Sequence, residues 1–343
     1  MENSYPEKPE ESKDVKIKQP PVLFRKTQKI IKEISSRVGG ILLTYWNNPG
    51  GSVCDNDVVA FYQMLKSIGY QERIYLFLKS CGGNVEVSIR LINLLREYCG
   101  EIVALIPLEC SSAATMIALG ANEIRMGPMA YLGAVDTSLT HDMSPVDRDN
   151  DLVSVSLDEL KRIVRLWSKE SGVNSDNPYH ALFPYIHPLV IGAVDRADSL
   201  SVMLCKEILL YHIDDKSKAE SIATALNSKY PSHSFPILQK EACKLGLNVA
   251  KLDNVTNDLL LDLNELYSEM GQKAITDFSE LKYHNNEICN IIETDGLQIY
   301  FKWDKDWYYR SAERRWVPMN DESHWWRCEL SGGKLKNTMF HLA

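Results

Sequence analysis

Short apolar runs alternate with segments of helical periodicity along the first half of the chain. Strands are predicted at 41–46, 74–78 and 102–108. Helices are predicted at 25–37, 58–68, 85–98 and 112–120. Strands and helices that alternate in this way are typical of an α/β fold with a parallel sheet.

The pattern becomes helical beyond residue 136 and changes again near residue 283. Further helices are predicted at 157–169, 187–211, 216–229, 238–245 and 257–271. The C-terminal region has short alternating runs and holds five of the seven tryptophans: Trp303, Trp307, Trp316, Trp325 and Trp326. We therefore expect a disordered leader at 1–22, a core with a helical extension at 23–280, and a separate, aromatic-rich β module at 281–343.

Composition indicates a globular protein. Of 343 residues, 45% are apolar and 24% are charged, and the net charge of −8 argues against nucleic-acid or anionic-membrane binding. No apolar run reaches the ~18 residues that a membrane span requires, and no signal-peptide pattern is found. The eight cysteines are scattered without metal-ligand spacing. We expect reduced thiols, no bound metal and a cytoplasmic location.

Two loops carry the candidate chemistry. The strand at 74–78 is followed by Gly82 and Gly83, and the strand at 102–108 by Ser111 and Ser112 at the start of a helix. Loops at the carboxyl ends of parallel strands meet at one edge of the sheet, where sites form in open α/β folds. A serine at the first turn of a helix lies where free N–H groups bind an oxyanion. The alternative is that the serine serves only as an N-cap.

Three ordered motifs resemble the serine dehydrogenase proteinase family, of the group that includes Clp protease subunits, signal peptide peptidase A and crotonases. They are LKSCGG at 78–83, SSAATMIALGANEIRMG at 111–127 and LGAVD at 132–136, and the similarity extends over roughly residues 35–250. The resemblance implies an α/β fold with a Clp/crotonase-like core of repeated β-β-α and βα units, added helices, and a small β-rich C-terminal appendage outside the similarity.

The resemblance also implies roles for particular residues. Ser112 would be the nucleophile, and the N–H groups of Gly82 or Gly83 and of Ala113 would form the oxyanion hole. The activity implied is that of a serine endopeptidase-like hydrolase acting on a protein or peptide, without metal or organic cofactor. Two positions depart from the family pattern: Ser80-Cys81 stands where threonine or serine followed by proline is usual, and Ala114 stands where glycine is common.

The general base stays open at this point. The Clp-type histidine would fall near residues 136 and 137, which are Asp136 and Thr137 here. A serine needs a neighbouring histidine or a lysine of lowered pKa to take its proton. The candidates are Asp136, His141, Lys161, His187 and His233, and Asp136 is the best placed because it lies within a motif. For each of them the alternative is a solvated charge or a core histidine.

The resemblance and the helical pattern also predict assembly and partners. The resemblance, and a predicted helix at 187–210 that is apolar on more than one face, imply a homo-oligomer. The aromatic segment 293–328 is a candidate surface for a protein partner. Two other functions remain open: a catalytically silent scaffold that binds a partner, and an acyl-CoA hydrolase or hydratase that would use the same oxyanion hole without Ser112.

Overall fold

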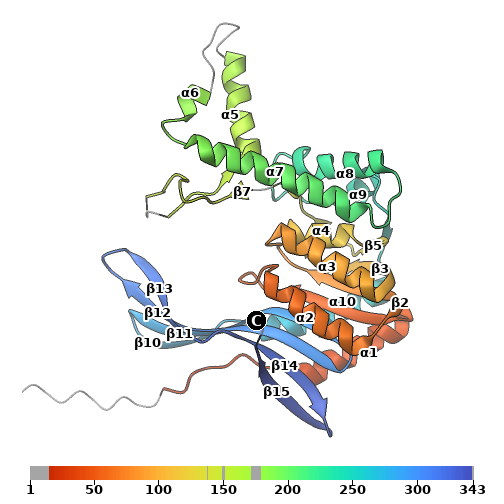
Figure 1. Cartoon of the computed structure of the whole chain (residues 1–343). Helices are drawn as coiled ribbons and strands as arrows, with labels where there is room; N and C mark the ends of the chain where they lie inside the picture. Colours follow the sequence, from red (N-terminus) through yellow and green to blue (C-terminus); the bar gives the residue numbers. More distant parts are fainter. Residues whose placement is uncertain (1–14, 137, 149–150, 171–178, 342–343) are drawn as a thin grey trace, which may run out of the picture.

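The computed structural model describes residues 15–136, 138–148, 151–170 and 179–341 and is built on one mixed sheet (Figure 1). The parallel half contains β1 (Ile41–Asn47), β2 (Gln71–Lys79), β3 (Cys99–Ile106), β5 (Glu123–Met126) and β9 (Val249–Lys251), paired in that order. The antiparallel half contains β11 (Lys282–Thr294), β12 (Leu297–Arg310), β14 (His324–Ser331) and β15 (Lys334–Phe340). β10 (Ala274–Ser279) pairs with β11, and β13 (Arg315–Asp321) with β12. The predicted α/β class is confirmed, whereas the repeated Clp-type core remains a prediction.

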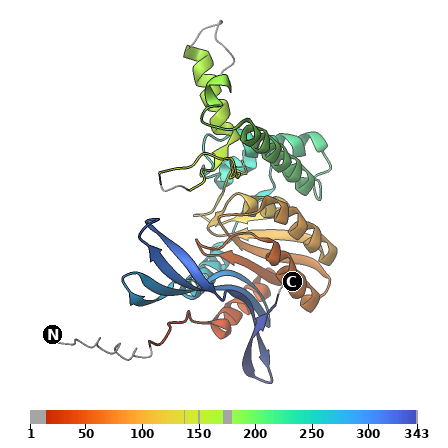
Figure 2. The same cartoon turned by 60° about the vertical axis from the view of Figure 1, so that its left-hand side comes forward.

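Helices cover both faces of the parallel half (Figures 1 and 2). α2 (Asp55–Ile68), α3 (Val85–Tyr98) and α4 (Ala113–Leu119) lie on one face, and α1 (Phe24–Val38) and α10 (Asn254–Met270) lie on the other. Successive strand residues point to opposite faces, so Leu76 and Leu78 enter the first core and Tyr75 and Phe77 the second. This double burial explains the uninterrupted apolar runs of these strands.

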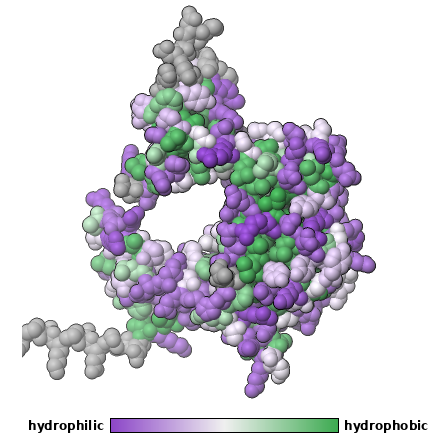
Figure 3. Space-filling view, in the orientation of Figure 1, coloured by the Kyte–Doolittle hydropathy of each residue, from purple (hydrophilic) through white to green (hydrophobic). Residues whose placement is uncertain are grey.

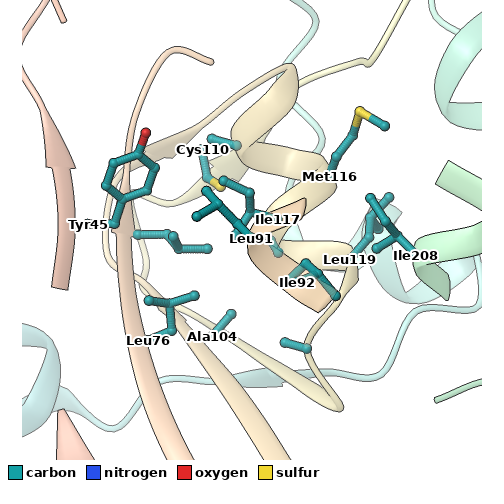
Figure 4. Packing of buried hydrophobic residues seen from close by; sticks show 14 of the residues in the cluster. Tyr45, Leu76, Leu91, Ile92, Ala104, Cys110, Met116, Ile117, Leu119 and Ile208 are labelled. Atoms are coloured by element: carbon teal, nitrogen blue, oxygen red, sulfur yellow. The ribbon is translucent and has the colours of Figure 1, made fainter. Parts of the chain in front are cut away.

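α4 is buried along its whole length because its residues are small or aliphatic. Figure 4 shows Ile117 and Leu119 packed beside Leu91 and Ile92 of α3, and every residue of α4 is buried. A side chain at Gly120 would meet Ile92 at 2.4 Å, so the end of α4 must carry no Cβ. The packing fixes the helix, and it thereby fixes the turn that precedes it.

The helical extension has two parts. α7 (Pro188–Leu209) packs its C-terminal half on the first core, together with α8 (Lys216–Ser228) and α9 (Gln239–Lys244). α5 (Leu157–Glu170) and α6 (Tyr179–Leu182) gather around the other half of α7 in a small core of their own, which projects away from the sheet (Figure 1). Within the described ranges, no helix has the length and apolarity to cross a membrane.

The C-terminal region was predicted to be separate from the core, but its strands belong to the same sheet. β11 pairs with β1, Tyr45 opposite Ile292, and both Ile291 and Ile292 are fully buried. Glu293 is also fully buried and accepts hydrogen bonds from Thr27 of α1 and Tyr267 of α10. The sequence change near residue 283 therefore marks the antiparallel half of one sheet, which the alternating pattern alone did not connect to β1.

The predicted leader is only partly within the described residues, since 1–14 lie outside them. Residues 15–22 run along the antiparallel half. The N–H of Lys18 donates to Thr276 Oγ1 at 2.9 Å, and Asn286 Nδ2 donates to the Lys18 carbonyl at 3.0 Å. The Lys18 backbone is thus hydrogen-bonded to side chains of β10 and β11, contrary to the expectation of disorder up to residue 22.

Candidate active site

Ser112 occupies a strained turn between β4 (Glu109–Cys110) and α4. Its backbone has φ 54° and ψ −125°, a conformation that costs a non-glycine residue on the order of 1–3 kcal/mol. In the described structure its side chain makes no capping hydrogen bond to α4, and the residue is partly exposed. The N-cap alternative is therefore not supported for Ser112. A sharp, strained strand-to-helix turn instead presents a serine hydroxyl at the surface, as nucleophile elbows do.

Gly82 brings a second backbone segment against this turn. A Cβ at Gly82 would lie 2.6 Å from Ser112 Cβ and 2.8 Å from the Ser111 carbonyl oxygen. Its φ of 106° is also unfavourable for any residue with a side chain. The loop that carries the paired glycines therefore touches the serine turn, as the two-loop prediction required.

The orientation of one peptide group in this loop points to an oxyanion hole. The Gly82 carbonyl accepts a hydrogen bond from Val53 N–H at 2.8 Å. In a trans peptide the N–H of Gly83 points the opposite way. The segment lies between Val53, which bridges Gly83, and Cys110, which bridges Ser80, so that N–H is directed to the side of the Ser112 turn.

Gly83 and Ala113 supply the N–H groups that remain free. Among the residues that the structure describes, neither N–H has a hydrogen-bond acceptor. The N–H of Gly82 instead donates to Ser80 Oγ at 3.0 Å. The geometry thus favours Gly83 over Gly82 as the partner of Ala113, which the sequence left undecided.

Asp136 and His233 form a pair. His233 Nδ1 and Asp136 Oδ1 are 2.9 Å apart, and the hydrogen bond and charge of Asp136 raise the pKa of His233. The His233 side chain is 53% exposed and that of Asp136 is 18% exposed. The pair uses Nδ1, so Nε2 is the ring nitrogen left to face another group.

Strand pairing places this pair at the end of the structure where Ser112 lies. Cys110 pairs with Leu132, and Leu132 pairs with Ile237 in the antiparallel sense. Ser112 follows Cys110, Asp136 follows Leu132, and His233 precedes Ile237, so all three leave their strands in the same direction. Two strand spacings separate the outer segments, about 10 Å. His233 and Ser112 therefore lie at the same end of these paired segments.

The other three base candidates have local roles. Lys161 lies on α5 in the projecting helical part, where it is 60% exposed and its Nζ is 3.9 Å from Asp198. His141 Nδ1 accepts the N–H of Met143 in a turn. His187 caps α7 by accepting the N–H of Leu189. The structure thus pairs only two of the five candidates with each other.

Sequence reasoning missed a polar cluster beneath Ser111. Lys79 Nζ is 3.0 Å from Glu109 Oε1 and donates to the Asn47 carbonyl, although Lys79 is only 8% exposed. Tyr131 donates to Glu109 Oε2 at 3.2 Å. Burial alone would raise the pKa of Glu109, but the hydrogen bond and charge of Lys79 hold it below its ordinary value. A lysine at the end of a buried strand was the available signal.

Ser111 is partly exposed, as Ser112 is, but lies against a different backbone segment. A Cβ at Gly133 would lie 2.7 Å from Ser111 Cβ, so the Ser111 side chain lies against the backbone of the 132–136 motif. Within the described ranges, no cluster of three or more histidine, cysteine or acidic side chains could hold a metal ion. The candidate site comprises Ser112, the N–H groups of Gly83 and Ala113, and the His233–Asp136 pair.

Comparisons with known proteins give distant similarities. No family model matches the sequence. Over 206 residues the chain is 24% identical to the uncharacterized protein MJ0137 of Methanocaldococcus jannaschii, and the match covers 60% of this chain and 62% of that protein. The chain thus spans less than two thirds of that relative's length.

The similar solved structures include two variants of one protease and a ClpP1 chain. A serine-to-alanine variant of the 1510-N membrane-bound stomatin-specific protease has 15% identity and a TM-score of 0.37 and covers 65% of this chain and 82% of that one. A lysine-to-alanine variant of it, in complex with a substrate peptide, has the same identity and TM-score, with 65% and 78% covered. ClpP1 from Listeria monocytogenes has 14% identity and a TM-score of 0.35, with 68% and 99% covered. TM-scores this low do not show which residues of this chain are catalytic.

Proposed function

We propose that the chain is a serine hydrolase that cleaves peptide bonds, with Ser112 as the nucleophile. The observation that carries the proposal is the strained backbone of Ser112, held against a glycine that tolerates no side chain. Strain of this kind persists only where the surrounding structure enforces it, and it concentrates at functional sites. A catalytically silent scaffold would gain nothing from this backbone strain.

In the proposed reaction, Ser112 Oγ attacks the substrate carbonyl and loses its proton to His233 Nε2. Asp136 orients the ring through Nδ1 and stabilises the imidazolium that forms. The N–H groups of Gly83 and Ala113 donate to the developing oxyanion. The imidazolium then protonates the leaving amine, and water, deprotonated by His233, hydrolyses the acyl-enzyme. Because His233 and Ser112 lie on segments two strands apart, we propose that the exposed residues 232–234 move toward Ser112 when substrate binds.

A fluorophosphonate probe tests the nucleophile directly. We expect the wild-type chain to be labelled, Ser112→Ala to lose labelling, and the matched variant Ser111→Ala to keep it. His233→Ala should slow labelling by about 10²–10⁴-fold, the usual contribution of a general base. Labelling that is lost in Ser111→Ala but kept in Ser112→Ala would contradict the assignment. An unlabelled wild-type chain would favour the scaffold or acyl-CoA alternatives.

A homo-oligomer remains a prediction. Its physical basis is a set of apolar side chains on the helical extension that are more than half exposed: Leu166, Tyr185, Leu189 and Met203. Light scattering at micromolar concentration should give a multiple of the 39.0 kDa chain mass. A monomeric mass would leave these side chains to another partner.

A further inference from the structure

The outer half of the β11–β12 hairpin forms an arm with two unlike faces. With β10 and β13, residues 282–287 and 303–310 extend beyond the helical layers, as Figure 2 shows. Opposed residues alternate between the faces. One face pairs His284 with Asp306 and is charged. The other pairs Tyr283 with Trp307 and is aromatic.

The aromatic face carries five aromatic side chains, and Lys305 lies between Trp303 and the other four. We define the aromatic stripe by these residues: Trp303, Tyr283, Trp307, Tyr309 and Trp316. Within it, Tyr283 and Trp316 have ring centroids 4.7 Å apart, and Tyr309 and Trp316 5.5 Å. Trp316 is 38% exposed, and the other four are half-buried. From Trp303 to Tyr309 the stripe is about 20 Å long, the length of some six extended residues.

The stripe begins at the rim of the candidate active site. A Cβ at Gly50 would lie 3.3 Å from the Trp303 ring, so the loop after β1 rests on the first aromatic of the stripe. The same loop continues to Val53, which bridges Gly83. On β12, Ile299 and Phe301 pack in the core beneath α2, α3 and α4. Trp303, Lys305, Trp307 and Tyr309 follow them at alternate positions, so the stripe lies on the same face of the sheet as α4.

The arm and the helical extension enclose an opening beside this edge of the core, which Figure 3 shows in surface view. At the tip of the arm, Arg315 Nη1 is 3.2 Å from Asp151 Oδ1, where the two projections meet. Both side chains are at least half exposed, so this ion pair adds little stability to the contact between the arm and the helical extension. The stripe therefore runs from the outer part of the arm to the loop at Gly50, which continues to Val53 beside Gly83.

We propose that the aromatic stripe binds an extended, unfolded polypeptide segment with apolar side chains and leads it to Ser112. This inference rests on the proposed function and names its substrate class. Half-exposed tryptophan and tyrosine are the residues that most often anchor protein partners. A nucleic acid is disfavoured, because the chain carries a net charge of −8, and Asp277 and Glu287 lie on the same face as the stripe. The lysine on that face, Lys305, is paired with Asp321.

Neighbouring tyrosines on β12 provide a matched test. Tyr309 lies on the stripe and Tyr308 on the charged face, where its ring lies 4.9 Å from Lys282 Nζ. In a Ser112→Ala background, binding of fluorescein-labelled β-casein, an unfolded chain, is measured by anisotropy. We expect Tyr309→Thr combined with Trp316→Thr to weaken binding at least about tenfold. Tyr308→Thr should bind within about twofold of the parent, and Trp316→Phe should retain binding because an aromatic ring remains.

Two results would overturn the inference. In one, the double variant binds casein as the parent does; in the other, Tyr308→Thr weakens binding equally, so that damage to the arm explains the loss. If the first result came with a changed oligomer mass of the double variant, the stripe would contact a second copy of the chain instead. Fluorophosphonate labelling of the wild-type chain separates the two proposals. Stripe-dependent binding without labelling would reject the hydrolase alone, and labelling without stripe-dependent binding would reject the stripe alone.

Discussion

Replacement of Gly82 by alanine tests the contact on which the candidate site depends. The new Cβ would lie 2.6 Å from Ser112 Cβ and 3.1 Å from Ala113 N, closer than real Cβ atoms approach in the first case. Relief requires backbone movement, because α4 is buried on all sides. Overpacking of this kind costs about 1–3 kcal/mol, and the φ of 106° adds about 1–3 kcal/mol. We expect a total loss of roughly 2–6 kcal/mol of unfolding free energy.

The control separates close approach from backbone strain. Gly39, after α1, also has positive φ, 72°, but a Cβ there would meet nothing within 4 Å. Gly39→Ala should therefore cost only about 1–2 kcal/mol. Urea unfolding followed by tryptophan fluorescence gives both values, and fluorophosphonate labelling reports the site. The reasoning is refuted if Gly82→Ala is no more destabilising than Gly39→Ala, or if it is labelled at the wild-type rate.

Three further predictions concern strain, ionisation and the sheet. Ser112→Gly should be about 1 kcal/mol more stable than Ser112→Ala, because glycine relieves the positive φ while both variants lack the hydroxyl; thermal unfolding decides this. Burial raises the pKa of Glu293 to about 7 from 4.5 despite the hydrogen bonds it accepts, so the folded state holds its proton longer than the unfolded state does. Its contribution should become less favourable by up to about 3 kcal/mol as pH rises from 4.5 to about 7, and Glu293→Gln should flatten that slope in urea titrations at several pH values. Truncation after Asp277 should leave an aggregating core, because it removes β11 from β1; a soluble, cooperatively unfolding fragment would contradict the single-sheet description.

Local elements could be predicted because their signals are local. The helix predicted at 85–98 coincides with α3, and the strand predicted at 41–46 lies within β1. Apolar periodicity and flanking glycines determine such segments within a few turns of chain. The same reasoning placed the serine turn and the Gly-Gly loop at one edge of the sheet, because parallel strands direct their carboxyl ends the same way.

Long-range pairing could not be predicted by the same means. β11 joins β1 across more than 230 residues, and its alternating pattern equally suits a free hairpin and a sheet edge. The aromatic composition suggested a separate module, but the aromatic residues belong to an arm whose base, Ile288 to Thr294, is buried in the core. The aromatic composition indicated the exposed half of the hairpin but gave no sign that its base pairs with β1.

The general base could not be identified from local sequence signals. Asp136 could be favoured from its place in a motif, whereas His233 lies 97 residues away with no pattern around it that marks a partner. Lys161 looked equivalent because it follows the motif on a helix, yet α5 packs on α7 in a separate small core and carries that lysine away from the sheet. What brings His233 to Asp136 is the Leu132–Ile237 pairing, two backbone hydrogen bonds that any apolar residues could make. A site assembled by such pairing becomes visible only when the strands are placed in space.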